Sequence, residues 1–242
     1  MKKFLCGLIL FAGAILLATP FVEARIAPLR VVFISGSAEY ESDKTMPILK
    51  KYLESKYPSL VNMVTAKGDD LPGLEAIDKC ETVVLFTRRL KVQGEQLERI
   101  KKYCTSGKPL VGIRTASHAI QTFLELDQEV FGGNYKGHYK DGPLTQVELI
   151  ASEKTQQILS GVTAFKSKGS LYKNTGLAKD VNIMLYGSAD GKTEPIAWTR
   201  EYKKGRIFYT SLGHQKDFEE ESFLRLMTNA ILWSAQRTPR TK

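Results

Sequence analysis

The sequence predicts an α/β protein in which helices cover both faces of a mostly parallel sheet. Short apolar runs rich in Val, Ile and Leu, such as residues 29–36, are typical of strands buried on both sides. These runs alternate with segments whose apolar residues recur at helical intervals, such as residues 44–57. The alternation implies parallel pairing, because parallel strands need a crossover connection that is usually a helix.

The first half of the chain is expected to contain four strands and two helices. The helix at 44–57 has Pro47 in its first turn, where proline is tolerated. A second helix is expected at 95–104, and Gly107 ends it before the next strand. The four expected strands are residues 29–36, 60–65, 81–89 and 108–115.

The second half is less regular. A strand is expected at 147–151 and a short helix at 155–159. Further strands are expected at 182–187, 194–200 and 205–213. The segment "EYKKG" between the last two supplies a hairpin turn, and a closing helix buries one apolar face between Phe223 and Ser234.

Residues 1–24 are predicted to be a secretory signal peptide. Two lysines precede an apolar stretch from Phe4 to Ala18, and small residues lead to a cleavage position after Ala24. The stretch is short for a membrane span, so no stable span is expected after cleavage, with an uncleaved anchor as the alternative. The protein is therefore expected to be exported, to the periplasm or the extracellular space.

The mature chain is expected to form a single domain, residues 25–238, followed by a basic tail at 239–242. The whole chain has a formal net charge of +9, but its Lys and Arg residues are scattered and form no basic run. We therefore expect a basic surface and no nucleic-acid partner. The sequence does not determine the oligomeric state, and a homo-oligomer is one alternative.

The sequence does not support catalysis by a cysteine nucleophile or binding of a nucleotide cofactor. After removal of the signal peptide two cysteines remain, Cys80 and Cys104, and both a disulfide and two free thiols stay open. Neither cysteine lies at the carboxyl end of an expected strand, and no nucleophile-elbow motif is present. Phosphate-loop and dinucleotide fingerprints are also absent, so no nucleotide cofactor is expected.

Candidate ligand-binding residues follow the strands, because ligands of open α/β sheets bind outside the carboxyl ends of the strands. These candidates are Ser35, Gly36, Glu39, Arg88, Arg114 and His118. Arg114 follows a buried strand and needs a partner, either a carboxylate such as Glu39 or a ligand, because an unpaired buried guanidinium is costly. Arg88 can accept an anionic or polyhydroxylated ligand, whereas Arg89 is interpreted as a solvated surface charge.

All three histidines, His118, His138 and His214, fall in expected loops. Imidazoles from separate segments can bind a divalent metal, with Glu39 or Asp217 as a fourth ligand, or act as general acid and base. The spacing of the histidines contains no known metal-binding motif. Metal binding, acid–base catalysis and separate structural roles for the three histidines therefore all stay open. If the last strand runs parallel to the others, His214 reaches the same edge of the sheet as His118.

The loop "FGGNYKGHY", residues 131–139, places three glycines around Tyr135 and His138. Clustered glycines indicate positive φ angles or a close approach of the backbone to a ligand. The alternative is a tight turn with His138 in solvent. Tyr135 and Tyr172 can stack on sugar rings or simply fill the core.

Several segments in order resemble the ThuA-like (trehalose-utilisation-type) family over about residues 29–235: "VVLFTRRL", "GKPLVGIRTASHA", "FGGNYKGHY" and "EPIAWTREYKKGRIFYTSLGHQKDF". The resemblance implies a flavodoxin-like sheet of the class I glutamine amidotransferase type and an association with sugar metabolism. His138 and His214 match family positions, whereas His118 is proposed from this sequence.

The chain also departs from the family pattern. Arg114 occupies the position of the amidotransferase nucleophile, so amidotransfer through a thiolate is excluded. Tyr40 and Glu41 stand where many members have a histidine, and residues 169–172, "GSLY", stand where they have Asp-Glu-x-Tyr. These losses put an inherited metal or acid–base set in doubt.

The leading hypothesis is an exported ThuA-like protein that acts on a small sugar-like molecule, a carbohydrate or keto-sugar, as a hydrolase, lyase or isomerase. In this hypothesis His118, His138 and His214 supply proton transfer or metal ligands, while Arg114 and Arg88 orient the substrate. The alternative is a non-catalytic module that binds a carbohydrate or a partner on a degenerate amidotransferase-like fold.

Overall fold

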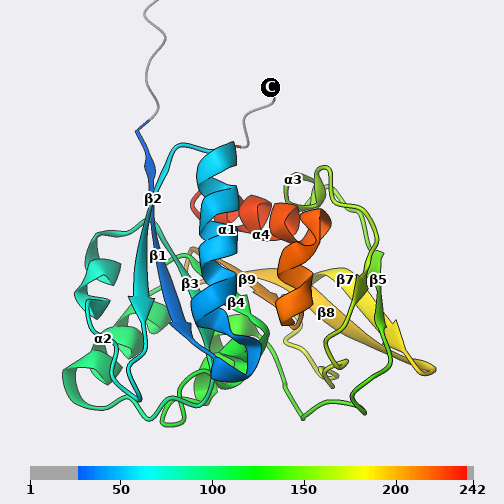
Figure 1. The fold of residues 1–242 in the computed structure, drawn as a ribbon, viewed down its shortest axis with the longest axis horizontal. Coiled ribbons are helices and arrows are strands. Elements are labelled where there is room, and N and C mark those ends of the chain that lie inside the picture. The colour runs from blue at the N-terminus through cyan, green and yellow to red at the C-terminus, as the bar shows by residue number, and fades with distance from the viewer. Residues whose placement is uncertain (1–26, 239–242) are drawn as a thin grey trace, which may run out of the picture.

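Five parallel strands form one half of a nine-stranded sheet in the computed structural model, which describes residues 27–238 (Figure 1). Their order in the sheet is β2-β1-β3-β4-β9. They are β1 (Leu29–Gly36), β2 (Ser59–Thr65), β3 (Thr82–Thr87), β4 (Leu110–Ile113) and β9 (Gly205–Thr210). Because β9 pairs in parallel with β4, the segment after β9 reaches the same edge of the sheet as the segment after β4.

Four antiparallel strands extend the sheet beyond β9 in the order β8-β7-β5-β6. They are β5 (Thr145–Leu149), β6 (Lys166–Ser167), β7 (Asn182–Ala189) and β8 (Lys192–Tyr202). The expected mostly parallel sheet is therefore corrected to a mixed sheet. The reversal occurs at the hairpin between β8 and β9, where Lys203 and Lys204 both have positive φ angles, as the tight turns favoured in hairpins require.

Helices cover both faces of the sheet, as expected. α1 (Ser42–Lys56) and α4 (Glu221–Ser234) lie on one face, and α2 (Gly94–Thr105) lies on the other (Figure 1). Alternate residues of β1 point to opposite faces, so that Phe33 packs in the core under α1 and α4 while Ile34 packs in the core under α2. The short helix α3 (Gln156–Leu159) packs beside α4.

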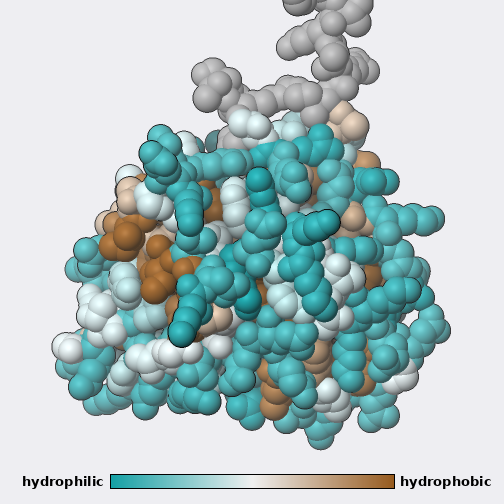
Figure 2. Space-filling view, turned by 180° about the vertical axis from the view of Figure 1, so that it is seen from behind, coloured by the Kyte–Doolittle hydropathy of each residue, from teal (hydrophilic) through white to brown (hydrophobic). Residues whose placement is uncertain are grey.

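The face of the molecule seen in Figure 2 is largely hydrophilic. Figure 2 shows the molecule from behind, where hydrophobic residues appear only in small groups. No helix within residues 27–238 is long and apolar enough to cross a membrane. The predicted signal peptide and the basic tail at 239–242 lie outside the described residues.

Cys80 and Cys104, the two cysteines within residues 27–238, are free thiols in the structure. Cys104 lies in α2 and Cys80 directly precedes β3, so both lie away from the carboxyl ends of the parallel strands. Burial raises the pKa of Cys104 to about 12 and also raises that of Cys80. Neither thiol is therefore set up as a nucleophile.

Candidate functional site

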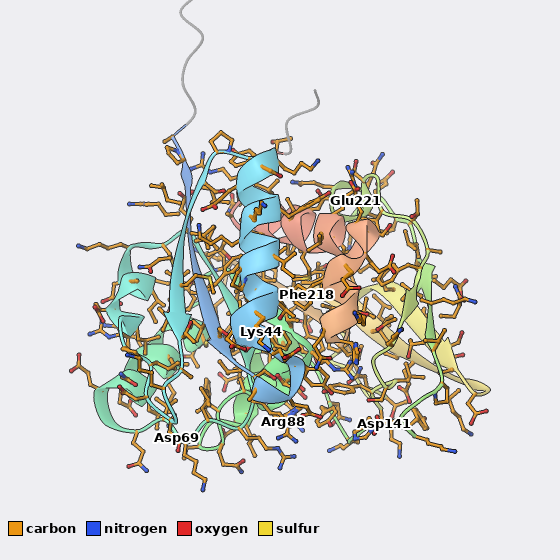
Figure 3. The ribbon with its side chains drawn as sticks, viewed as in Figure 1. Lys44, Asp69, Arg88, Asp141, Phe218 and Glu221 are labelled. Carbon is orange, nitrogen blue, oxygen red and sulfur yellow. The ribbon has the colours of Figure 1, made fainter. Side chains whose placement is uncertain are left out.

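Three short helices follow the parallel strands at their carboxyl ends and form one rim of the molecule. They are η1 (Ala38–Tyr40) after β1, η3 (Arg114–His118) after β4 and η5 (Gln215–Glu219) after β9. The rim is the lower edge of Figure 1, and Arg88 and Asp141 lie along it in Figure 3. This is the edge at which the sequence predicted the ligand site.

Arg114 lies fully buried in the rim, between the rings of Tyr40 and Tyr172. Its guanidinium carbon is 4.5 Å from one ring centroid and 4.6 Å from the other. Nη1 donates to the carbonyl oxygen of Ser211 at 2.6 Å, and Nη2 donates to the carbonyl and hydroxyl oxygens of Ser170 at 3.3 and 3.2 Å. Carbonyl oxygens and aromatic faces thus replace a counter-ion.

The expectation that Arg114 pairs with a carboxylate such as Glu39 is wrong. Glu39 instead forms an ion pair with Arg88, with 2.7 Å between Oε2 and Nε. Space for the Arg114 guanidinium comes from Gly169, where a Cβ atom would lie 2.7 Å from Nη1. The φ angle of Arg114 is +45°, a strained value for a non-glycine residue that matches the strained turn of a nucleophile elbow.

A pocket of about 400 Å³ opens at this rim. Its walls come from η3, from the loop after β3 and from the segment around the π-helix η4 (Leu126–Phe131). Polar and aromatic residues line it, including Arg89, Ser117, His118, Asp127, Tyr135 and Lys136. The volume lies within the range of sites that bind small molecules.

His118 lies in the wall of the pocket and is only 6% exposed. Its Nδ1 is 3.0 Å from the hydroxyl oxygen of Ser117, and its ring stacks on that of Tyr135 with 4.6 Å between the centroids. Burial, together with the positive charges of Arg89 and Arg88, lowers the pKa of His118 to about 3. The imidazole is therefore neutral at neutral pH.

Asp127 also lines the pocket, although the sequence pattern did not indicate it. Its Oδ2 accepts a hydrogen bond from the backbone N–H of Tyr135 at 2.8 Å, whereas its buried Oδ1 has no partner among the described residues. Burial raises the pKa of this carboxyl group to about 6. The one feature of the sequence that could have indicated a close contact here is Gly133, because a Cβ atom at this position would lie 2.1 Å from Oδ1 of Asp127.

The glycine-rich loop therefore serves two purposes. Gly132 and Gly137 adopt positive φ angles, which other residues rarely tolerate, and Gly133 leaves room for the carboxyl group of Asp127. Within the described structure the backbone at Gly133 closely approaches a side chain of the protein itself, and the predicted approach to a ligand stays a prediction.

Of the three histidines, all within the described part, only His118 lines this pocket. His138 is exposed, with Nδ1 2.7 Å from the carbonyl oxygen of Tyr139 and 3.6 Å from Oδ1 of Asp141. His214 caps η5, because its Nδ1 accepts a hydrogen bond from the backbone N–H of Lys216 at 3.2 Å. Burial lowers the pKa of His214.

The candidate metal ligands are not grouped around one point. Residues 27–238 contain no cluster of three or more His, Cys, Asp or Glu side chains arranged to hold a metal ion. Asp217 is buried, and its Oδ2 accepts hydrogen bonds from the backbone N–H groups of Gly213 and His214 and from the hydroxyl of Ser167, at 2.8, 3.0 and 2.9 Å. It fixes the loop after β9.

Of the remaining substrate-binding candidates, one lines the pocket and three lie outside its lining. Tyr135 lines the pocket, and the buried Tyr172 packs behind it with 4.6 Å between the ring centroids. Ser35 is buried and donates a hydrogen bond to the hydroxyl of Ser42, and Gly36 leaves room for Leu90. Both therefore support the turn after β1.

The fold and the rim together define an α/β protein with a glutamine amidotransferase-like fold. Residues 30–234 match the ThuA family, which is described as "Trehalose utilisation", and the chain belongs to this family. No match was found among curated proteins.

Solved structures show the same fold. A ThuA-like protein from Parabacteroides merdae ATCC 43184 is 20% identical, with a TM-score of 0.70 over 89% of this chain and 93% of that one. A ThuA-like protein from Bacteroides uniformis ATCC 8492 is 16% identical, with a TM-score of 0.68 over 92% and 99%. A GMP synthase subunit from Thermoplasma acidophilum is 12% identical, with a TM-score of 0.57 over 87% and 96%.

Proposed function

We propose that this protein is an exported enzyme that binds a carbohydrate or keto-sugar in the His118 pocket and transfers protons on it. The family description supports a carbohydrate-related role. The observation that carries the chemistry is Asp127, a buried carboxyl group with one unpartnered oxygen in the same pocket as a neutral imidazole. A general acid–base group works best when its pKa is close to the working pH, and a pKa of about 6 meets this condition.

The residues then take separate roles. Asp127 gives and takes the proton, while His118 stays neutral and forms a hydrogen bond to the substrate. Tyr135 presents part of its ring to the pocket, where a sugar can stack on it. Arg114 lies behind this wall and holds Tyr172 and the loop of Ser170 in place, so it acts as a positioning residue.

The lining favours an isomerase or lyase over a typical glycosidase. Most glycosidases use two carboxyl groups on either side of the scissile bond. Asp127 is the one acidic residue among the described residues that line this pocket. Removal of a proton next to the carbonyl of a keto-sugar needs one base and a hydrogen-bond donor to the oxygen, and this pocket can supply both.

Proton transfer is tested by incubating the protein with a panel of keto-sugars in deuterium oxide and following deuterium incorporation by NMR. We expect exchange with the wild-type protein and a loss of at least about 100-fold with Asp127→Asn, the range typical of a general acid–base group. Asp141→Asn is the matched control, because this exposed aspartate lies outside the pocket lining. Sugar binding by calorimetry without any exchange would refute the catalytic proposal.

The second candidate is a non-catalytic carbohydrate-binding module. The stacked His118 and Tyr135 favour it, because aromatic platforms are sufficient to bind sugar rings. In this case Asp127→Asn would leave the affinity for sugars within a few-fold of wild type, and no product would form. The two candidates therefore give opposite results in the exchange experiment.

Export is proposed from the sequence of residues 1–24. Expression in a bacterial host followed by N-terminal sequencing of the secreted or periplasmic protein tests it. A mature chain that begins at Arg25 is expected, and an intact N-terminus in the membrane fraction would refute it.

A further inference from the structure

Two basic side chains from different segments of the chain line the His118 pocket. Arg89 comes from the loop after β3, and Lys136 comes from the segment between η4 and β5. Both are exposed, although the sequence predicted only a solvated surface charge for Arg89.

The backbone holds Arg89 at this position against its preference. Its φ angle is +49°, in the left-handed region that non-glycine residues avoid. The backbone N–H of Arg89 donates to the carbonyl oxygen of His118 at 2.8 Å, and that of Leu90 donates to Ala119 at 3.0 Å. These bonds connect the loop after β3 to η3 and fix the base of the Arg89 side chain at the pocket. Strain of this kind is concentrated at functional sites.

Neither cation of the pocket has an ion-pair partner within residues 27–238. The adjacent Arg88 differs, because Glu39 pairs with it at 2.7 Å. Arg89 and Lys136 belong to none of the ion pairs in the described structure. Their charges are thus free to meet a ligand.

The field of these charges reaches the interior of the pocket. After burial, Arg89 and Arg88 are the neighbours that lower the pKa of His118 most. Lys136 likewise acts on Asp127, where its charge lowers the pKa against the larger effect of burial. With Asp127 ionised, two cations and one carboxylate leave the lining with one positive charge to spare.

We propose that the ligand of this pocket is a sugar acid, a polyhydroxylated molecule with one carboxylate. This inference rests on the proposed function and names its substrate class. The guanidinium of Arg89 presents a planar fork that matches a carboxylate, and Lys136 adds a second positive charge. One carboxylate neutralises the spare charge, whereas a phosphate monoester with two charges would leave an excess. Gln121 and Gln128, also in the lining, can hydrogen-bond sugar hydroxyls.

Calorimetric titration of matched sugars tests this assignment. The probes are D-glucuronate and D-gluconate, with D-glucose as the neutral counterpart and D-glucose 6-phosphate as the phosphorylated one. We expect the acids to bind at least about 10-fold more tightly than glucose at low salt, and the difference to shrink as sodium chloride is added because salt screens exposed charges.

Substitutions of Arg89 and Lys136 test whether these two side chains cause the tighter binding of sugar acids. Arg89→Gln and Lys136→Gln should each weaken glucuronate binding by about 5- to 10-fold and leave glucose binding unchanged. Lys140→Gln is the matched control, since Lys140 is an exposed lysine of the same segment outside the pocket lining. Circular dichroism melting curves establish that each variant is folded.

The outcomes separate this inference from the proposed function. Equal binding of glucose and glucuronate would overturn the sugar-acid assignment and leave a carbohydrate role intact. Tighter binding of glucose 6-phosphate than of both acids would also overturn it. Binding of none of the four probes together with no exchange on the keto-sugars would overturn both.

Discussion

Asp127 in η4 and Asp217 in η5 lie at the same rim, and both are buried carboxyl groups whose pKa is raised by burial. Oδ2 of Asp217 accepts three hydrogen bonds, two from Gly213 and His214 in the loop after β9 and one from Ser167 in β6. The segment around η4 gives Oδ2 of Asp127 one donor. In both residues Oδ1 is buried without a hydrogen-bond partner among residues 27–238.

The difference separates a structural carboxylate from one that is available for chemistry. Three donors fix the geometry of Asp217, and with it the turn through Gly213 that positions His214. Asp127 lines an open pocket next to His118, and its proton can exchange with a ligand there. Burial alone therefore does not distinguish the two carboxyl groups; the number of their hydrogen-bond donors and their access to a pocket do.

The largest effect is expected from Asp217→Ala. This variant leaves three donors in a buried loop without an acceptor, which should lower the free energy of unfolding by about 3 to 5 kcal/mol. Urea denaturation at pH 7 measures it, with the exposed Asp141→Ala as control. A loss below about 1 kcal/mol would show that Asp217 does not hold the loop.

Asp127→Asn should change the pH dependence of stability. The folded state keeps the proton of Asp127 up to about pH 6, whereas an unfolded chain releases it near 3.8, so the wild-type protein loses stability as the pH rises through this window. The variant lacks this loss. Its free energy of unfolding relative to wild type should therefore increase by about 3 kcal/mol from pH 3.5 to pH 7.

Denaturation curves across that pH range provide the measurement, and Asp141→Asn is again the control. Curves of wild type and Asp127→Asn that stay parallel would show that Asp127 titrates normally. The acid–base role proposed for Asp127 would then lose its support.

Gly133→Ala is expected to have an intermediate effect. The added Cβ would lie 2.1 Å from Oδ1 of Asp127, and the forced displacement should cost about 2 kcal/mol of stability. Gly137→Ala is the comparison, because it meets no atoms within 4 Å and suffers only from its φ angle of +91°, a cost of about 1 kcal/mol. Equal losses in thermal or urea melts would refute the steric role of Gly133.

His138→Ala should have the smallest effect, within about 0.5 kcal/mol, because its side chain is exposed and lies outside the pocket lining. Sugar binding should also be unchanged, as measured by the same calorimetric titration. A large loss of sugar binding would show that His138 contributes to the ligand site. It would support the role that the family resemblance implies for this residue.

Much of the fold could be predicted from the sequence because it depends on local periodicity. The run at 29–36 and the helical spacing at 44–57 correspond to β1 and α1 within two residues at each end. The hairpin between β8 and β9 was predicted and is observed, but the extent of the antiparallel pairing of β7 and β8 was underestimated. Their direction is decided by the hairpin connections of the chain.

The sequence by itself determined the order of strands and helices and the edge of the sheet where polar residues collect. These features follow from residue spacing, which is local. Only the tertiary structure decided which of these residues share a pocket, that Glu39 pairs with Arg88 rather than Arg114, and that Asp127 is buried with a single donor. Such properties depend on contacts between distant segments, which set desolvation and hydrogen bonding but leave no periodic pattern in the chain.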